Sequence, residues 1–145
     1  MPENESRVPS TGVVGLGEIG GGIAGNLMKA GVDLSVCDIR EKATAPYREG
    51  ARVAASPREL AGNCDVVFVA VLNDAQVRSV LEGDDGVFAG ASEGTTVVVV
   101  STVTTETVKE MREAGARHGV TVVDCGVSGG TQGAADGQLV WMVGG

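Results

Sequence analysis

The sequence has 145 residues, of which 43% are hydrophobic and 21% charged. This length and composition are typical of one globular domain and exclude a disordered chain. The net charge of −8 at pH 7 leaves no basic surface that could neutralise phosphates. We therefore expect neither a nucleic acid nor an anionic membrane as a partner.

The polar, acidic start of the sequence lacks the apolar segment of a signal peptide. We expect a flexible tail over residues 1–9 and one domain over residues 10–145. The longest apolar runs are too short to cross a bilayer. Three widely spaced cysteines, Cys37, Cys64 and Cys125, and a single histidine favour reduced, buried thiols in a cytoplasmic protein and speak against a zinc site.

Five short runs rich in valine predict strands. They are residues 12–15 (GVVG), 34–37 (LSVC), 65–72 (DVVFVAVL), 96–100 (TVVVV) and 120–124 (VTVVD). The runs do not alternate between apolar and polar residues, which is typical of parallel strands that are covered on both faces.

Helical patterns lie between these strands. The first has apolar residues every four positions and ends at Gly31. The second follows Asp74, which we expect to be its N-cap, and the third follows Thr104, with Glu106 favourably placed in its first turn. The apolar positions are Ile19, Ile23 and Leu27, then Val77, Val80 and Leu81, then Val108, Met111 and Gly115. This alternation predicts a doubly wound α/β fold of the Rossmann type, with a mostly parallel sheet.

The first strand-to-helix turn carries a glycine pattern. Gly15, Gly17 and Gly20 have the spacing G-x-G-x-x-G, and Asp38 ends the next predicted strand. In this context the pattern predicts a dinucleotide site. Gly15 permits a tight turn, Gly17 lets the backbone approach a pyrophosphate, and Gly20 lets helix and strand pack closely. The helix N-terminus then presents N–H groups and a partial positive charge to the phosphates.

The acid after the second strand bears on the choice of coenzyme. Asp38 should accept hydrogen bonds from the adenosine ribose and repel a 2′-phosphate, which favours NAD. Arg40 could instead reach a 2′-phosphate, so NADP stays an alternative. A glycine-rich packing turn without a ligand is the structural alternative. Gly21 and Gly22 speak against it, because each costs about 1 kcal/mol relative to alanine within a helix.

Four stretches, in order, resemble the β-hydroxyacid dehydrogenase family, whose type member is 3-hydroxyisobutyrate dehydrogenase. They are GLGEIGGGIAGNLMKAG, DVVFVAVLND, VVVVSTVTTETVKEM and DCGVSGGTQGAADGQLVWMVGG, and the resemblance covers about residues 10–145. It implies the NAD-binding domain of an oxidoreductase that transfers a hydride between a nicotinamide cofactor and a small β-hydroxy acid. The substrate would be of the 3-hydroxyisobutyrate or the tartronate-semialdehyde/glyoxylate type.

The resemblance also implies which residues form the site. The cofactor would contact Gly15, Leu16, Gly17, Glu18, Ile19, Gly20, Asp38, Ile39, Arg40, Leu72, Asn73 and Thr102. Thr102 would lie beside the nicotinamide, although it could also be a helix N-cap. Residues 124–137, which alone would suggest a flexible linker, become a substrate loop in which Ser128, Gly129 and Gly130 hold the substrate with hydroxyl and N–H donors.

The sequence departs from the family pattern at a few positions. Ile19 stands where the family usually has Met, Asn73 occupies a common proline position, Cys125-Gly126 replaces Ala-Pro, and Trp141 is unusual. None of these changes removes a functional group. The changed entry to the substrate loop leaves the identity of the hydroxy acid open.

The family's general acid/base lysine would lie on a helix after Gly145, together with the all-helical C-terminal domain that usually builds the homodimer. None of Lys29, Lys42 and Lys109 fits its motif, so we assign no catalytic residue and expect this chain alone to be inactive. We expect Asp124 to be a structural acid at a strand end and His118 to be a solvated residue after a helix. The alternatives are a 6-phosphogluconate dehydrogenase-like or imine reductase-like domain, or a non-catalytic nucleotide-binding module.

Overall fold

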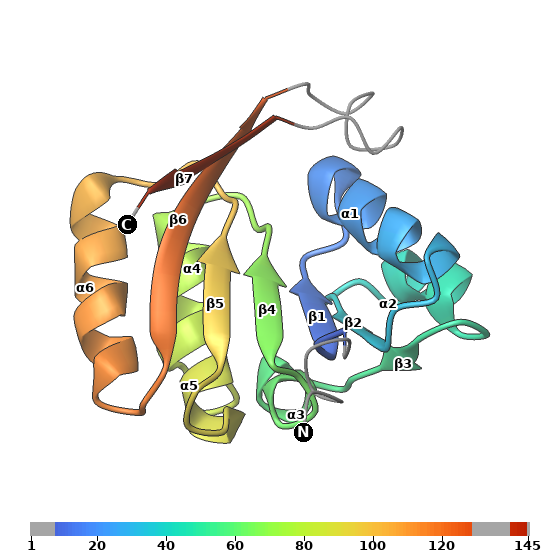
Figure 1. Cartoon of the computed structure of the whole chain (residues 1–145), viewed down its shortest axis with the longest axis horizontal. Helices are drawn as coiled ribbons and strands as arrows, with labels where there is room; N and C mark the ends of the chain where they lie inside the picture. Colours follow the sequence, from blue (N-terminus) through green and yellow to red (C-terminus); the bar gives the residue numbers. More distant parts are fainter. Residues whose placement is uncertain (1–7, 129–139, 145) are drawn as a thin grey trace, which may run out of the picture.

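One sheet of seven strands runs through the part of the chain that the computed structural model describes, residues 8–128 and 140–144 (Figure 1). The strands are β1 (Thr11–Val14), β2 (Leu34–Cys37), β3 (Arg52–Val53), β4 (Val66–Val69), β5 (Thr96–Val99), β6 (Thr121–Ser128) and β7 (Val140–Gly144). Their order is β3-β2-β1-β4-β5-β6-β7. Neighbouring strands are parallel throughout, except that β7 pairs antiparallel with β6. The order of the six parallel strands is that of Rossmann-type domains, so the predicted fold is confirmed.

Helices cover the two faces of this sheet. They are α1 (Glu18–Lys29), α2 (Glu41–Thr44), α3 (Pro57–Ala61), α4 (Asp74–Glu82), α5 (Val87–Gly90) and α6 (Thr105–Ala116), with the 3-10 helix η2 (Ala45–Tyr47). On one face, residues of α3, α4, α5 and α6 pack on β4, β5 and β6. On the other face, α1 and Tyr47 of η2 pack on β1 and β2.

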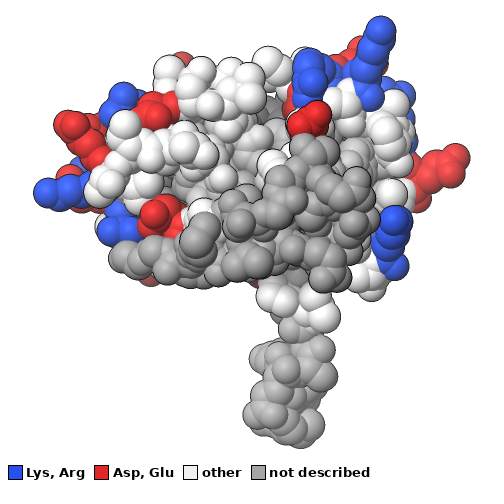
Figure 2. Space-filling model, turned by 90° about the horizontal axis from the view of Figure 1, so that it is seen from above, with Lys and Arg blue, Asp and Glu red and all other residues white. Residues whose placement is uncertain are grey.

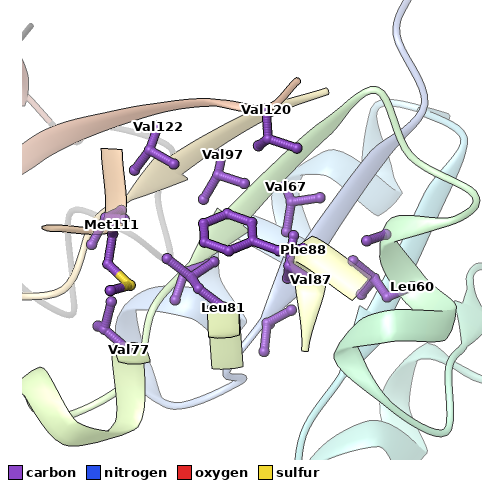
Figure 3. Close-up of a cluster of buried hydrophobic side chains, with 14 of the residues drawn as sticks. Leu60, Val67, Val77, Leu81, Val87, Phe88, Val97, Met111, Val120 and Val122 are labelled. Carbon is purple, nitrogen blue, oxygen red and sulfur yellow. The ribbon is translucent and has the colours of Figure 1, made fainter. Parts of the chain in front are cut away.

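The larger hydrophobic core lies under α3 to α6 and is built from valines that alternate along each strand. Val67, Val97 and Val122 are 0–1% exposed and point from adjacent strands at Phe88 and Leu81 (Figure 3). Full burial of one such side chain is worth about 1.5–3 kcal/mol relative to its exposure to water. This layer therefore fixes the register of the strands whose carboxyl ends form the cleft of the domain.

All five predicted strands and all three predicted helices are present, with changed ends. β4 ends at Val69 instead of residue 72, and β6 continues to Ser128 instead of ending at 124. As predicted, Gly31 follows the end of α1 with a φ of 77°, and Glu106 lies in the first turn of α6. Strand β3 and the short helices α2, α3, α5 and η2 were not predicted, because two to five residues are too few to show a periodic pattern.

The predicted N-cap of α4 is wrong by one residue. Asn73, with an extended φ of −153°, is the cap, and its side chain accepts a hydrogen bond from the Gln76 N–H at 2.9 Å. Asp74 is the first helical residue, and its carboxylate accepts hydrogen bonds from Thr104 and Thr107 instead.

The three cysteines are free and buried, as expected. Burial, followed by the charges of Asp38 and Glu59, raises the pKa of the Cys37 thiol to about 11.

Candidate functional site

A cleft opens at the carboxyl ends of the strands, where the sheet changes direction. The chain leaves β1 toward β2 on one side, whereas β4, β5 and β6 follow on the other side of β1 (Figure 1). In open α/β sheets, this switch point is where ligands bind. The cleft has a volume of about 860 Å³ and is lined by the start of α1, the ends of β4 and β5, and residues 124–126 of β6. Figure 2 shows this face from above, with the visible charged side chains gathered toward its left and right edges.

Residues 15–20, which we call the glycine wall, bring bare backbone to one side of the cleft. Gly15 has a φ of +96°, a conformation that side chains disfavour, and a Cβ there would overlap the Ala70 carbonyl. A Cβ on Gly20 would overlap the Gly15 carbonyl, so α1 can approach the end of β1 this closely only with glycine at position 20. Gly17 differs from both, because a Cβ built on it meets nothing within 4 Å. The space in front of Gly17 is thus open to the cleft.

The first turn of α1 supplies hydrogen-bond donors beside this space. The first N–H groups of any α-helix have no partner within the helix. In α3, α4 and α6 the N-cap side chains of Ser56, Asn73 and Thr104 each satisfy one of them. The cap of α1 is Gly17, which has no side chain. The amides and the dipole of α1 can therefore serve a bound anion.

Asp38 follows β2 and turns its carboxylate toward the glycine wall. Oδ2 accepts a hydrogen bond from the Leu16 N–H at 2.7 Å, and Oδ1 accepts one from the Arg40 N–H at 2.8 Å. The Arg40 guanidinium pairs with both oxygens at 3.1 Å. Burial opposes ionisation, but the hydrogen bonds from Arg40 and Leu16 and the charge of Arg40 outweigh it and hold the pKa of the Asp38 carboxyl below its ordinary value.

The opposite side of the cleft, residues 70–74 and 101–104, is held together by hydroxyl groups and is called the hydroxyl wall. The Ser101 hydroxyl accepts a hydrogen bond from the Val71 N–H at 2.8 Å and donates one to the Val69 carbonyl at 3.3 Å. It thereby joins the end of β5 to the end of β4. The Leu72 N–H donates to the Gln76 side chain at 2.7 Å, and this hydrogen bond holds the backbone of Leu72 in the wall.

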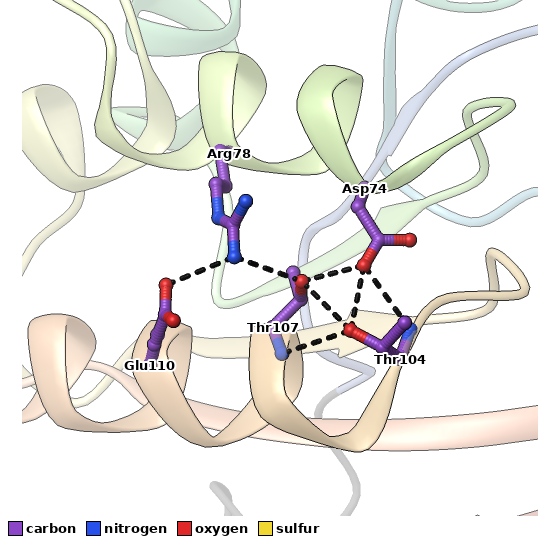
Figure 4. Close-up of polar contacts among 5 residues, drawn as sticks. All are labelled: Asp74, Arg78, Thr104, Thr107 and Glu110. Carbon is purple, nitrogen blue, oxygen red and sulfur yellow. Dashed lines mark hydrogen bonds and ion pairs between the residues drawn. The ribbon is translucent and has the colours of Figure 1, made fainter.

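Asp74 extends this wall into the contact between α4 and α6 (Figure 4). One of its oxygens accepts hydrogen bonds from the Thr107 hydroxyl, the Thr104 hydroxyl and the Thr104 N–H, at 2.6, 2.7 and 3.2 Å. Arg78 of α4 then donates to Thr107 at 3.1 Å and to Glu110 at 3.0 Å. The hydrogen bonds from Thr107 and Thr104 lower the pKa of the Asp74 carboxyl.

Comparison with known proteins shows to which family this chain belongs. Residues 10–145 match the family described as the NAD binding domain of 6-phosphogluconate dehydrogenase. The chain belongs to this family. It is 38% identical over 133 residues to a 3-hydroxyisobutyrate dehydrogenase of Pseudomonas aeruginosa, covering 91% of this chain and 45% of the relative. It is 36% identical over 135 residues to an L-threonate dehydrogenase of Cupriavidus necator, covering 92% of this chain and 46% of the relative.

A solved structure agrees with these matches. The crystal structure of a 3-hydroxyisobutyrate dehydrogenase from Salmonella typhimurium is 38% identical, with a TM-score of 0.84 over 92% of this chain and 47% of that one. The chain thus spans less than half the length of the relatives that it matches. The resemblance to the β-hydroxyacid dehydrogenases is confirmed, and so is NAD as the cofactor of the family.

Six of the twelve predicted cofactor residues of this NAD-binding domain line the cleft. They are Gly17, Glu18, Ile19, Gly20, Leu72 and Thr102. Ile39 and Leu72 are large apolar side chains that are 99% and 85% exposed. Thr102 is not the helix cap that the sequence left as an alternative, because Thr104 takes that place and accepts from the Thr107 N–H. Ser101 was not predicted, since a serine after a strand gives no sign of the amide that it will meet 30 residues away.

The predicted substrate residues are only partly described. Gly129 and Gly130 lie outside the described residues, and Ser128 is described as the last residue of β6, paired in register with Val140. Asp124 is not at a strand end, because β6 continues past it; it lines the cleft and pairs with Arg112 at 3.8 Å. His118 is exposed, as expected, and stacks on Phe88 with ring centroids 5.6 Å apart.

Among the described residues, few side chains in the cleft carry a charge and none belongs to a metal-binding cluster. Of the described residues that line it, only Glu18 and Asp124 carry a charge at neutral pH. The described residues contain no group of three or more His, Cys, Asp or Glu side chains that could hold a metal ion. Within the same residues, no helix has both the length and the apolar character needed to cross a membrane. Lys29, Lys42 and Lys109 are exposed on α1, α2 and α6, outside the cleft.

Proposed function

We propose that this domain binds NAD for a dehydrogenase that transfers a hydride between the nicotinamide and a small β-hydroxy acid. One observation carries the proposal. In the turn between β1 and α1, a Cβ would collide with the backbone at Gly15 and at Gly20. At Gly17, between them, a Cβ would collide with nothing. Packing explains the first two and leaves Gly17, which lines the cleft, unexplained. A ligand that approaches the backbone explains it.

The residues present fit a dinucleotide. The pyrophosphate would lie against Gly17 and the first amides of α1, where the helix dipole favours negative charge. Asp38 would face the adenosine ribose, and the exposed side chains of Ile39 and Leu72 would be covered by the apolar parts of the coenzyme. Thr102 and Asn73, at the hydroxyl wall, would lie toward the nicotinamide. The coenzyme supplies the hydride chemistry, and the protein supplies its position and its electrostatic surroundings.

The substrate class rests on the relatives and on the cleft. The relatives named above act on 3-hydroxyisobutyrate and L-threonate according to their names, and both are small hydroxy acids. No Lys or Arg side chain is among the described residues that line the cleft, which disfavours a phosphorylated sugar acid. Ser128, Gly129 and Gly130 would hold the substrate carboxylate or hydroxyl through O–H and N–H donors.

Proton transfer needs a group within hydrogen-bond reach of the substrate oxygen. The three lysines of the chain lie outside the cleft, and Asp124 is paired with Arg112. We therefore propose that residues outside this chain complete the active site and that the chain alone binds coenzyme without turnover. We further propose that the complete protein is cytoplasmic and forms a homodimer. The free, buried cysteines support the cytoplasmic location.

The test is calorimetric titration of this chain with NAD, using Gly17→Val as the variant. Wild type should bind weakly, and Gly17→Val should lose at least about tenfold in affinity, because its side chain fills the space that the pyrophosphate needs. Gly25→Ala, at a site on α1 where a Cβ also meets nothing within 4 Å, is the control and should bind like wild type. Absence of binding by wild type at millimolar NAD would refute the proposal.

A further inference from the structure

The hydroxyl wall consists of two loops, one between β4 and α4 and one between β5 and α6. The first loop carries Leu72 and Asn73 and the second carries Thr102, and all three residues would contact the coenzyme. The pairing of β4 with β5 ends at Val69 and Val99. Beyond these residues, the relative position of the two loops depends on side chains.

Thr102 is held in place by its neighbours in the chain. It is exposed, lines the cleft and makes no hydrogen bond to another residue that the structure describes. On one side of it, the Ser101 hydroxyl accepts a hydrogen bond from the Val71 N–H at 2.8 Å. On the other side, the hydroxyl and the N–H of Thr104 both donate to Asp74, at 2.7 and 3.2 Å. The position of Thr102 in the cleft therefore depends on these two anchors.

Asp74 is the anchor that joins the ends of both loops. It follows Asn73 directly in the chain, and one of its oxygens reaches across to Thr104 and Thr107 of the other loop and helix (Figure 4). The Thr107 side chain is buried, so water does not compete freely for this end of the contact. A displacement of Asp74 would therefore move Asn73 on one loop and Thr104 on the other.

A second contact joins the same two helices farther along α4. Arg78, one helical turn after Asp74, donates to Glu110 of α6 at 3.0 Å. This ion pair holds α4 against α6, but neither of its residues belongs to the two loops. If Asp74 served only to hold the helices together, loss of either contact would affect the coenzyme in the same way.

We propose that Asp74 positions the nicotinamide end of the coenzyme, because it fixes Leu72 and Asn73 relative to Thr102. Asp74 is not among the described residues that line the cleft, so it is a positioning residue and not a catalytic one. The inference rests on the proposed function, since it needs NAD in the cleft with its nicotinamide at the hydroxyl wall. Adenosine and pyrophosphate would lie at the glycine wall, which Asp74 does not touch.

The experiment compares the dissociation constants of NAD and of ADP-ribose, which lacks the nicotinamide, by calorimetry of this chain. Wild type should bind NAD more tightly than ADP-ribose. Asp74→Ala should weaken NAD binding about three- to tenfold, the contribution of one hydrogen bond, and change ADP-ribose binding by less than about twofold. Asp74→Asn, which keeps an acceptor oxygen, should recover most of the lost affinity for NAD.

Glu110→Ala is the matched control. It removes the second contact between α4 and α6 and should change neither affinity. Thr104→Val removes the hydroxyl that donates to Asp74 and nearly keeps the shape of the side chain. It should resemble Asp74→Ala, and it decides the question if Asp74→Ala does not fold.

Three results would overturn the inference and leave the proposed function intact. They are unchanged NAD binding in the folded variants, equal losses of affinity for NAD and ADP-ribose, and equal affinities of wild type for the two ligands. A wild-type chain that binds neither ligand would overturn both the inference and the proposed function.

Discussion

The glycine wall and the hydroxyl wall meet at Ala70 and line the same cleft, yet different interactions shape them. On the glycine wall, missing side chains let Gly20 of α1 lie against the Gly15 carbonyl and let Gly15 lie against the Ala70 carbonyl. On the hydroxyl wall, the Ser101 hydroxyl and the Asp74 carboxylate hold two loops that come from distant parts of the sequence. At Gly15 and Gly20 the first wall is therefore determined by steric exclusion, which tolerates no added atom. The second wall is determined by hydrogen bonds, which can be lost one at a time.

The largest effect is expected on the glycine wall. Gly20→Ala should destabilise the domain by about 3 kcal/mol, because its Cβ overlaps the Gly15 carbonyl and overpacking of a rigid site costs this much. Urea unfolding measures the change. Gly25→Ala, on the same helix with open space around it, should instead stabilise the domain by up to about 1 kcal/mol. Equal stabilities of the two variants would show that steric exclusion does not shape this wall.

The hydroxyl wall should respond less. Ser101→Ala leaves the Val71 N–H without its acceptor and the Val69 carbonyl without one donor. We expect a loss of about 1–2 kcal/mol in the free energy of unfolding, the usual cost of an unmade hydrogen bond in a partly buried place. Ser92→Ala, at an exposed serine outside the cleft, is the control with no expected change. If both serine variants unfold at the wild-type urea concentration, Ser101 does not join the two strands.

The smallest effect is a dependence on acid. The pKa values of Asp38 and Asp74 are lowered in the folded chain, so the stability that these carboxylates contribute is present above the ordinary aspartate pKa of 3.8. It is lost as the pH falls from there through the lower pKa of the folded state. Asp74→Asn should therefore unfold with a flatter pH profile than wild type below about pH 4.

Thermal unfolding between pH 7 and pH 2 gives this profile. Asp84→Asn, at an exposed aspartate outside both walls, should reproduce the wild-type curve. A wild-type slope below pH 4 that survives in Asp74→Asn would assign the acid sensitivity to Asp38 and the glycine wall. The hydrogen bonds that Asp74 accepts would then contribute little to the stability of the hydroxyl wall.

The amino-acid sequence is sufficient to predict the valine-rich strands, the long helices and the glycine turn. Each depends on a short stretch of chain: valine runs predict covered strands, and Gly15, Gly17 and Gly20 need only the turn that contains them. The same reasoning brings Asp38 to the correct edge of the sheet, since the carboxyl ends of parallel strands meet there.

Which polar groups meet depends on the folded arrangement of distant segments. Whether Asn73 or Asp74 caps α4 depends on Thr104 and Thr107, about 30 residues away, which bind the Asp74 carboxylate and leave the cap to Asn73. Ser101 matters only because β5 lies beside β4, and Asp38 meets Leu16 only because β2 lies beside β1. A hydrogen bond acts over about 3 Å, and no pattern along the chain records which distant atoms folding will bring within that distance.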